Sequence, residues 1–155
     1  MSGAPVEILL VEDNENDAEL ALYGLREHRL ANEIAVVRDG VEALDFLFST
    51  GAYAARSTEA PPRLILLDLK LPKLDGLDVL RRVKTDPRTR TIPVVMLTSS
   101  REERDLIESY RLGVNSYIVK PVDFEQFTQA VAQLGLYWLL LNQPPPPLRV
   151  TPEVG

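Results

Sequence analysis

Polar residues of the kinds that carry metal and phosphoryl chemistry follow several short, largely apolar runs of the chain. They are Glu12 and Asp13 after Val6–Val11, Asp68 after Leu64–Leu67, Thr98 after Ile92–Leu97, and Lys120 after Ser116–Val119. A short apolar run bounded by turn-forming residues is typical of a strand buried on both faces of a parallel sheet. Because parallel strands end at one edge of the sheet, where open α/β proteins bind their ligands, we expect these side chains to converge there.

Three carboxylates at such an edge, from Glu12, Asp13 and Asp68, require a counter-charge. Two like charges about 4 Å apart, at an effective dielectric constant of about 20, repel each other by about 4 kcal/mol. A divalent cation removes this cost, and oxygen ligands without a nearby His or Cys favour Mg²⁺. Because Mg²⁺ usually shares its coordination shell with waters and substrate phosphate oxygens, the pattern predicts a phosphoryl-transfer site.

The polar residues at the ends of the other strands fit the same chemistry. Asp68 is placed as the nucleophile, since carboxylates form aspartyl phosphates. Lys120 and the metal would neutralise charge on the transferring group, and Thr98 would donate a hydrogen bond to a phosphoryl oxygen. Taken singly, each residue also has an ordinary interpretation, as a loop acid, a turn residue or a solvated lysine. Their joint placement is what favours a functional site.

The composition indicates one acidic globular domain and excludes several classes of protein. The chain has 155 residues, of which 45% are hydrophobic and 26% charged, with no cysteine and a net charge of −6. One domain is the default at this length, and disulfides and thiolate metal sites are excluded. The negative charge argues against general nucleic-acid binding, which needs a basic face. The apolar runs fall far short of the ~20 residues of a membrane span, and residues 1–5 show no signal-peptide pattern, so we expect a cytoplasmic protein with no membrane contact.

Five strand-then-helix units are expected along the chain. The strands are predicted within 6–11, 33–38, 64–67, 92–97 and 116–119, and a stretch with helical periodicity follows each. Alternating strands and helices with short connections predict an α/β fold, with a parallel sheet and helices on both faces. We expect a domain over residues 1–141, whose last helix extends to about Leu141. Residues 142–155 form a Pro-rich tail that cannot continue a helix.

Two residues at the start of the first helix have purely local interpretations. Asn16 is the expected helix cap, with Glu19 three residues further on. Asp17 is interpreted as a first-turn acid that interacts favourably with the helix dipole.

Four separated motifs resemble those of the receiver domain of two-component response regulators. They are Val11–Asn14, Leu67–Gly76, Leu97–Ser99 and Ser116–Pro121, in that order and spacing within about residues 6–134. The resemblance implies a flavodoxin-like, doubly wound, five-stranded parallel sheet of order 2-1-3-4-5. It also implies a switch rather than an enzyme, in which Asp68 accepts a phosphoryl group from a histidine kinase with the help of Mg²⁺.

The resemblance assigns the metal ligands residue by residue. Asp13 and Asp68 would bind Mg²⁺ directly, together with the backbone carbonyl of Lys70, whereas Glu12 would act through a water molecule. Lys70 is a departure from the family's pattern. Its long cationic side chain would stand near the phosphoryl entrance.

The resemblance also assigns the residues that respond to phosphorylation. Thr98 and Lys120 would bind the phosphoryl group. Thr98 and Tyr117 would form a switch pair, in which Tyr117 rotates inward as Thr98 moves toward the phosphate. From the residues alone, Tyr117 is almost as well explained as a half-buried strand aromatic. The Lys120–Pro121 peptide bond would be cis, which an X–Pro bond permits.

The last predicted helix becomes apolar nearly all round toward its end, at Tyr137, Trp138, Leu139 and Leu140. A surface helix of this kind needs a partner. We therefore predict a homodimer through this extension and the face formed by the fourth strand, the fifth strand and the last helix. Since no output domain is expected after it, the chain resembles the single-domain regulators paired with bacterial phytochrome histidine kinases.

Three other functions are weighed against a phosphorylated switch: a phosphatase of the haloacid-dehalogenase type, a flavin carrier, and an interaction module on a receiver fold that is not phosphorylated. A phosphatase of that type needs a second Asp where Lys70 stands. A flavin carrier needs a phosphate-binding loop where Glu12 and Asp13 stand, and these acids would repel a phosphate. The intact set of phosphoryl-site residues disfavours the unphosphorylated module.

Overall fold

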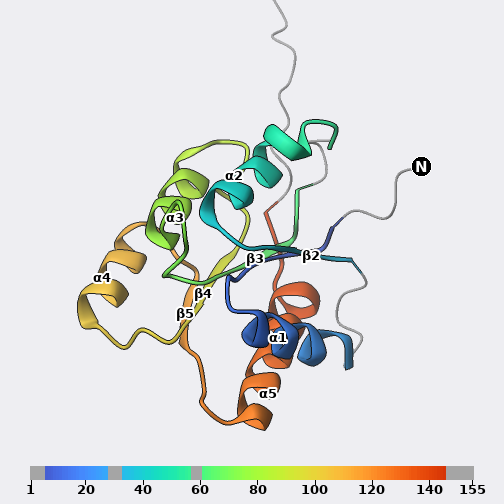
Figure 1. The fold of residues 1–155 in the computed structure, drawn as a ribbon, viewed down its shortest axis with the longest axis vertical. Helices are drawn as coiled ribbons and strands as arrows, with labels where there is room; N and C mark the ends of the chain where they lie inside the picture. The colour runs from blue at the N-terminus through green and yellow to red at the C-terminus, as the bar shows by residue number, and fades with distance from the viewer. Residues whose placement is uncertain (1–5, 28–32, 57–60, 146–155) are drawn as a thin grey trace, which may run out of the picture.

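The protein is a parallel five-stranded sheet between two layers of helices (Figure 1), and its computed structural model describes residues 6–27, 33–56 and 61–145. The strands are β1 Ile8–Val11, β2 Ile34–Val37, β3 Leu64–Leu67, β4 Val94–Thr98 and β5 Ser116–Val119. Every strand pair is parallel, and the order across the sheet is β2-β1-β3-β4-β5. The predicted flavodoxin-like α/β fold and its strand order are therefore confirmed.

A helix follows each strand of the sheet. The helices are α1 Glu15–Glu27, α2 Gly40–Phe48, α3 Gly76–Thr85, α4 Glu103–Arg111 and α5 Phe124–Gly135, with a one-turn 3₁₀-helix η1 at Gly51–Tyr53 and a π-helix η2 at Leu136–Leu141. The helices α1 and α5 lie side by side on one face, and α2, α3 and α4 lie on the other (Figure 1). No described helix has both the length and the apolar content needed to cross a membrane.

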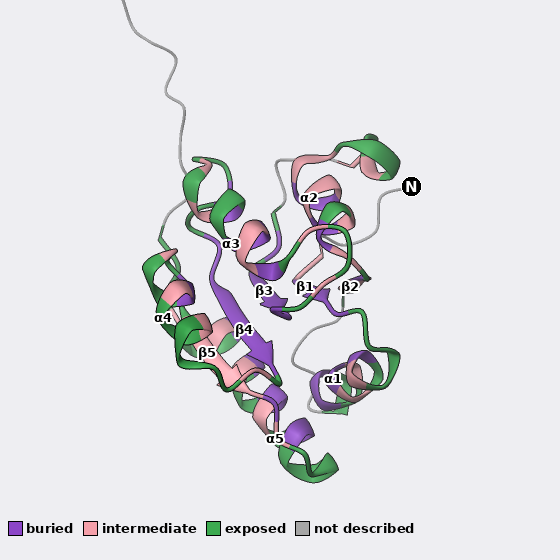
Figure 2. Cartoon of the chain, turned by 60° about the vertical axis from the view of Figure 1, so that its left-hand side comes forward, coloured by how far each residue is buried: buried purple, intermediate pink, exposed green. Residues whose placement is uncertain are grey.

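The central strands are apolar throughout because alternate side chains enter two different cores. In β3, Ile65 and Leu67 pack in the core under α2 and α3, whereas Leu64 and Leu66 pack in the core under α1 and α5. All four residues are buried, as are those of β1 and β4 (Figure 2). Burying both faces in this way explains why these strands are continuous apolar runs rather than alternating ones.

Short polar side chains cap the starts of α1, α2 and α5. Asp39 accepts a hydrogen bond from the Glu42 N–H at 2.7 Å, and Asp123 accepts one from the Gln126 N–H at 3.0 Å. The cap of α1 differs from the prediction, because Asn14 Oδ1 accepts the Asp17 N–H at 3.0 Å and the helix starts two residues earlier than Asn16 would allow. Each cap provides an acceptor for an N–H at the start of a helix that has no partner within the helix.

The chain after α5 continues as a π-helix instead of ending or remaining α-helical. The Asn142 N–H donates to the Tyr137 carbonyl at 2.6 Å, which is the i→i+5 pattern of a π-helix. This winding buries Leu139 against the core under α1 and α5 and leaves Leu140 63% exposed. The guanidinium of Arg63, next to the start of β3, donates to the Leu139 carbonyl at 2.5 Å. Of the predicted Pro-rich tail, residues 146–155 lie outside the described part of the chain.

Replacing Arg63 by Met should loosen the π-helix, because the Leu139 carbonyl loses its charged donor while the apolar stem of the side chain is kept. Hydrogen bonds to charged groups contribute about 1.5–3 kcal/mol. We expect faster amide hydrogen exchange over residues 136–142 than in the wild type. Arg81→Met is the matched control, since Arg81 pairs only with Asp78 of its own helix in the described structure. Equal exchange rates in Arg63→Met and the wild type would contradict the assignment.

Candidate functional site

The carboxylates expected at the sheet edge are brought together by the pairing of β1 with β3. Val11 and Leu67 are register partners, and the Asp68 N–H donates to the Val11 carbonyl at 3.0 Å. Glu12 and Asp68 therefore leave the sheet side by side, and Asp13 follows on the surface. Oxygen atoms of these three carboxylates lie within 4.8 Å of one another. A group made only of carboxylate oxygens at this spacing fits a hard divalent cation such as Mg²⁺.

Lys120 supplies the positive charge of the site from two strands away. Its backbone N–H donates to the Thr98 carbonyl at 2.7 Å, which places it beside the end of β4. Its Nζ donates to Glu12 Oε1 at 2.6 Å, to Asp17 Oδ2 at 2.8 Å and to Asp68 Oδ2 at 3.1 Å. Burial by itself would lower the pKa of this ammonium group, but the hydrogen bonds that it donates to Asp17 and Glu12 and the charge of Asp68 outweigh burial and raise the pKa. Lys120 is thus held charged.

Glu12 is the acid most affected by its surroundings, since only 3% of it is exposed. Its pKa is raised to about 7. Burial is the main cause and the nearby charge of Asp68 adds to it, whereas the hydrogen bond from Lys120 lowers the pKa. The second carboxylate oxygen of Glu12 accepts the Asn14 N–H at 3.1 Å. Both oxygens therefore have partners within the protein, and Glu12 is positioned as a rigid acid behind the surface-exposed Asp13.

Asp17 joins the site although its sequence context indicated only a first-turn helix acid. Because α1 starts at Glu15, Asp17 lies in the first turn and its carboxylate reaches the Lys120 ammonium group. The available signal was its position four residues after Asp13, on the helix that follows β1. That signal was ambiguous, because the orientation of a helical side chain depends on the residue at which the helix begins.

The carboxylate of Asp68 stands at the wall of an open cavity of about 590 Å³. Its Oδ1 accepts the Leu69 N–H at 2.7 Å and its Oδ2 accepts from Lys120. The residues that line the cavity are mostly polar: Asp13, Asn14, Glu15, Asn16, Asp17, Asp68, Lys70, Ser99 and Lys120. Lys70 is exposed and lines this cavity two residues after Asp68. A small solute in this cavity therefore meets an oriented carboxylate.

The side chains of Thr98 and Tyr117 both hydrogen-bond to the backbone of Ser100, in the loop after β4. Thr98 is buried, and its Oγ1 accepts the Ser100 N–H at 3.2 Å. The Tyr117 hydroxyl donates to the Ser100 carbonyl at 3.1 Å. Burial raises the pKa of the half-buried Tyr117, with contributions in the same direction from the acids around it, so its hydroxyl is a donor at neutral pH.

The predicted cis form of the Lys120–Pro121 peptide bond is corrected by the structure. No peptide bond among the described residues is cis, so this bond is trans. The two isomers of an X–Pro bond differ by only about 0.5–1 kcal/mol, so the residue types alone do not decide between them.

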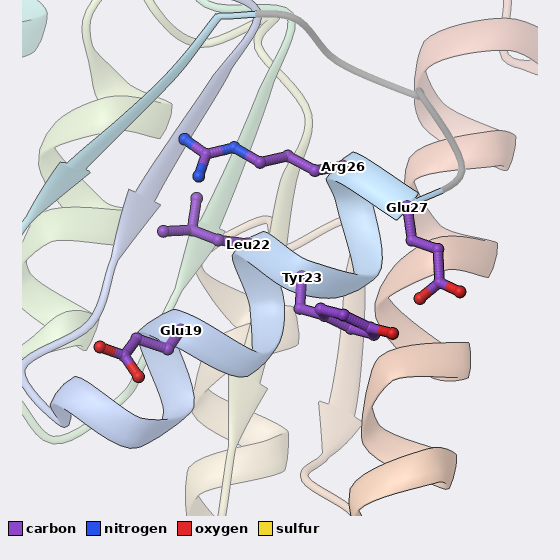
Figure 3. A pocket seen from close by; sticks show the side chains of 5 residues that line it. All are labelled: Glu19, Leu22, Tyr23, Arg26 and Glu27. Carbon is purple, nitrogen blue, oxygen red and sulfur yellow. The ribbon is translucent and has the colours of Figure 1, made fainter.

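A second hollow lies on the exposed side of α1, along one face of the helix (Figure 3). Its lining residues are Glu19, Leu22, Tyr23, Arg26 and Glu27. The Tyr23 ring extends toward α5 and lies 6.0 Å from the Phe124 ring, at an interplanar angle of 48°. Both aromatic side chains are about half exposed. Helix α1 thus lines both hollows, because its first turn contributes Asp17 to the Asp68 cavity.

The fold and the site together define a class: doubly wound α/β proteins with an oriented carboxylate, a group of acids spaced to hold a cation and a buried lysine at one sheet edge. A family model described as the response regulator receiver domain matches residues 8–132 of the chain. The chain belongs to this family.

Three relatives show how far the similarity extends. The response regulator Rcp1 of Synechocystis sp. is 41% identical over 138 residues, which cover 89% of this chain and 92% of Rcp1. The phosphorylated cyanobacterial phytochrome response regulator RcpA has a solved structure with a TM-score of 0.85 and 43% identity, covering 92% of this chain and all of that one. The structure of the bacteriophytochrome response regulator AtBRR is 57% identical, with a TM-score of 0.71 and coverage of 91% and 100%.

Proposed function

We propose that this protein is a phosphorylation switch in which Asp68 accepts a phosphoryl group from a histidine kinase. The observation that carries the proposal is the orientation of Asp68, whose Oδ2 accepts from Lys120 and whose Oδ1 accepts the Leu69 N–H at the wall of an open polar cavity. A carboxylate held in this way is positioned for attack on phosphorus, with a cation beside the charge that develops. At most, slow loss of the phosphoryl group would be an activity of the protein itself.

Mg²⁺ would be held by Asp13, Asp68 and the backbone carbonyl of Lys70, with Glu12 acting through a water. It would supply positive charge to the transferring group. The residues of the chain then have distinct tasks. Lys120 neutralises one phosphoryl oxygen, and Thr98 donates its hydroxyl proton to another. Since Thr98 Oγ1 accepts the Ser100 N–H, that proton is free to be donated.

The test is incubation of the purified protein with Mg²⁺ and acetyl phosphate, followed by intact-mass measurement. We expect the mass to increase by one phosphoryl group, and we expect this increase to be lost when EDTA removes the metal, because the acids of the site then repel the donor. The control is the same chelated sample after excess Mg²⁺ has been restored, which should label again. Equal labelling with and without EDTA would contradict the metal requirement.

A phytochrome-type light sensor is the proposed source of the phosphoryl group. The proposal is supported by the resemblance to RcpA and AtBRR, which are described as phytochrome and bacteriophytochrome response regulators. The kinase would dock on the side that carries the Asp68 cavity. Val122, two residues after the cavity residue Lys120, is 99% exposed, and Phe124, two residues further on, pairs with Tyr23 of α1. A cytoplasmic location and the absence of nucleic-acid and membrane partners belong to the same proposal.

A homodimer through the C-terminal extension is also proposed, with one change to its predicted contacts. Leu139 packs in the core of its own chain, because the π-helix turns it inward, and Trp138 is half-buried. The exposed apolar residues of the extension are Leu136, Tyr137, Leu140 and Leu141. These side chains, rather than Leu139, would form the contact.

The double substitution Tyr137→Ser and Leu140→Ser should shift the protein toward monomer, because both side chains are about half exposed or more and neither belongs to the core clusters of its own chain. Sedimentation velocity of the full chain measures the effect. Val41→Ser on α2 is the control, since Val41 is a similarly exposed apolar residue on another helix. A dimer that survives the double substitution, or a wild-type chain that is monomeric, would refute the proposed contact.

A further inference from the structure

Ser100, two residues after the end of β4, is bonded through every one of its polar atoms. Its N–H donates to Thr98 Oγ1 at 3.2 Å, and its carbonyl accepts from the Tyr117 hydroxyl at 3.1 Å. Its hydroxyl donates to Asp105 Oδ2 at 2.6 Å and accepts the Glu102 N–H at 3.3 Å. Ser100 therefore joins the end of β4, the start of α4 and the Tyr117 side chain of β5.

The bond to Thr98 connects Ser100 to the chemistry of the site. Thr98 is the hydroxyl residue beside Lys120, whose N–H donates to the Thr98 carbonyl. When Thr98 turns its hydroxyl toward a phosphoryl group on Asp68, the acceptor of the Ser100 N–H moves with it. Ser100 therefore receives any displacement of Thr98 through its own backbone.

The bonds to Asp105 and Glu102 connect Ser100 to α4, which has little other anchorage. The only residue that α4 buries is Ser109, and the rest of the helix is intermediate or exposed (Figure 2). Glu102, the residue before the helix, has no side-chain capping bond in the described structure. The hydroxyl of Ser100 accepts its N–H instead and binds the first-turn acid Asp105. A helix with so few buried side chains owes much of its orientation to such end contacts.

We propose that Ser100 is a positioning residue that transmits phosphorylation at Asp68 to helix α4 through its hydrogen bond to Asp105. The proposal rests on the proposed function of Asp68. A displacement of Thr98 moves the Ser100 backbone, the Ser100 hydroxyl moves with it, and Asp105 draws the first turn of α4 along. The face of α4 that bears the exposed residues Leu106, Ile107 and Tyr110 changes its orientation as a result.

The experiment measures the two ends of this connection separately. Labelling of Asp68 is measured by intact mass after acetyl phosphate and Mg²⁺. The response of α4 is measured as the change in the ¹H–¹⁵N chemical shifts of Leu106, Ile107 and Tyr110 when beryllofluoride, a stable phosphoryl mimic, is added with Mg²⁺. The variants are Ser100→Ala, which removes only the hydroxyl, Ser100→Thr, which keeps one, and Asp105→Ala, which removes the acceptor. Ser109→Ala is the control, because Ser109 lies on α4 and its hydroxyl has no hydrogen-bond partner among the described residues.

We expect Ser100→Ala and Asp105→Ala to be labelled like the wild type but to lose most of the α4 shift change. The double variant Ser100→Ala with Asp105→Ala should lose no more of the α4 shift change than either single variant, since each substitution removes the same hydrogen bond. Ser100→Thr and Ser109→Ala should respond like the wild type, which shows that the helix is not merely destabilised. A full α4 response in labelled Ser100→Ala, or a labelled wild type without an α4 response, would overturn the inference. An unlabelled wild type would overturn the proposed function instead.

Discussion

Asp68→Asn is expected to abolish phosphoryl incorporation while the protein remains folded. The amide of Asn cannot replace the carboxylate as the nucleophile. The substitution also removes one of the negatively charged ligands proposed for Mg²⁺. The site itself explains why the fold should survive. One amide orientation keeps an acceptor toward the Leu69 N–H and the other keeps an acceptor toward Lys120 Nζ, so only one of the two hydrogen bonds is lost. Lys120 also keeps Glu12 and Asp17 as partners.

The measurement is intact mass after acetyl phosphate and Mg²⁺, together with urea unfolding of the same samples. We expect no labelled species in the variant and a free energy of unfolding within about 1–3 kcal/mol of the wild type, the range for one unsatisfied buried donor. Asp78→Asn is the matched control, because Asp78 is a half-exposed acid that pairs with Arg81 on α3. It should label fully. If Asp68→Asn were labelled as strongly as Asp78→Asn, Asp68 would not be the phosphoacceptor.

The fold could be predicted from the sequence because buried parallel strands leave a direct trace in it. The run Leu64–Leu67 is apolar at every position since alternate residues enter two separate cores. The residue that follows such a run must leave the sheet at its carboxyl edge, so the approximate position of Asp68 followed from the same pattern. The meeting of Glu12 with Asp68 needs only the added fact that β1 and β3 are neighbours.

Details that depend on small energy differences or on helix phase could not be predicted in this way. Asn14 and Asn16 are equally good caps by residue type, and the choice of Asn14 is what turns Asp17 toward Lys120. The cis and trans isomers of the Lys120–Pro121 bond differ in free energy by about 0.5–1 kcal/mol, and packing around the bond can favour either isomer by that amount. The π-helix after Gly135 involves a donor, Arg63, that lies 76 residues away from Leu139 in the chain.

Lys120→Ala is expected to separate phosphorylation from its consequences. Its carboxylate partners remain and Mg²⁺ can still neutralise the transferring group, so the variant should be labelled with acetyl phosphate. The phosphorylated state then lacks the cation that joins β5 to the phosphoryl group. Since the Lys120 backbone is bonded to Thr98, we expect most of the chemical-shift change in β5 and α4 to be lost. A full response in labelled Lys120→Ala would leave the lysine without its assigned role.

The same variant should also be markedly less stable in the absence of Mg²⁺. Lys120 is buried with three carboxylates around its Nζ, and its removal leaves the buried Glu12 and Asp68 without a counter-charge. Removing one partner from a buried ion pair costs about 3–5 kcal/mol. We expect a loss of this size in urea unfolding with EDTA, and a smaller loss with saturating Mg²⁺, because a cation bound to the folded state restores positive charge to the acids. Lys73→Ala is the control, since Lys73 is exposed and lies 3.5 Å from a single acid, Asp39. Its stability should be nearly unchanged and independent of the metal, whereas an equal loss in both lysine variants would show that Lys120 does not stabilise the acidic site.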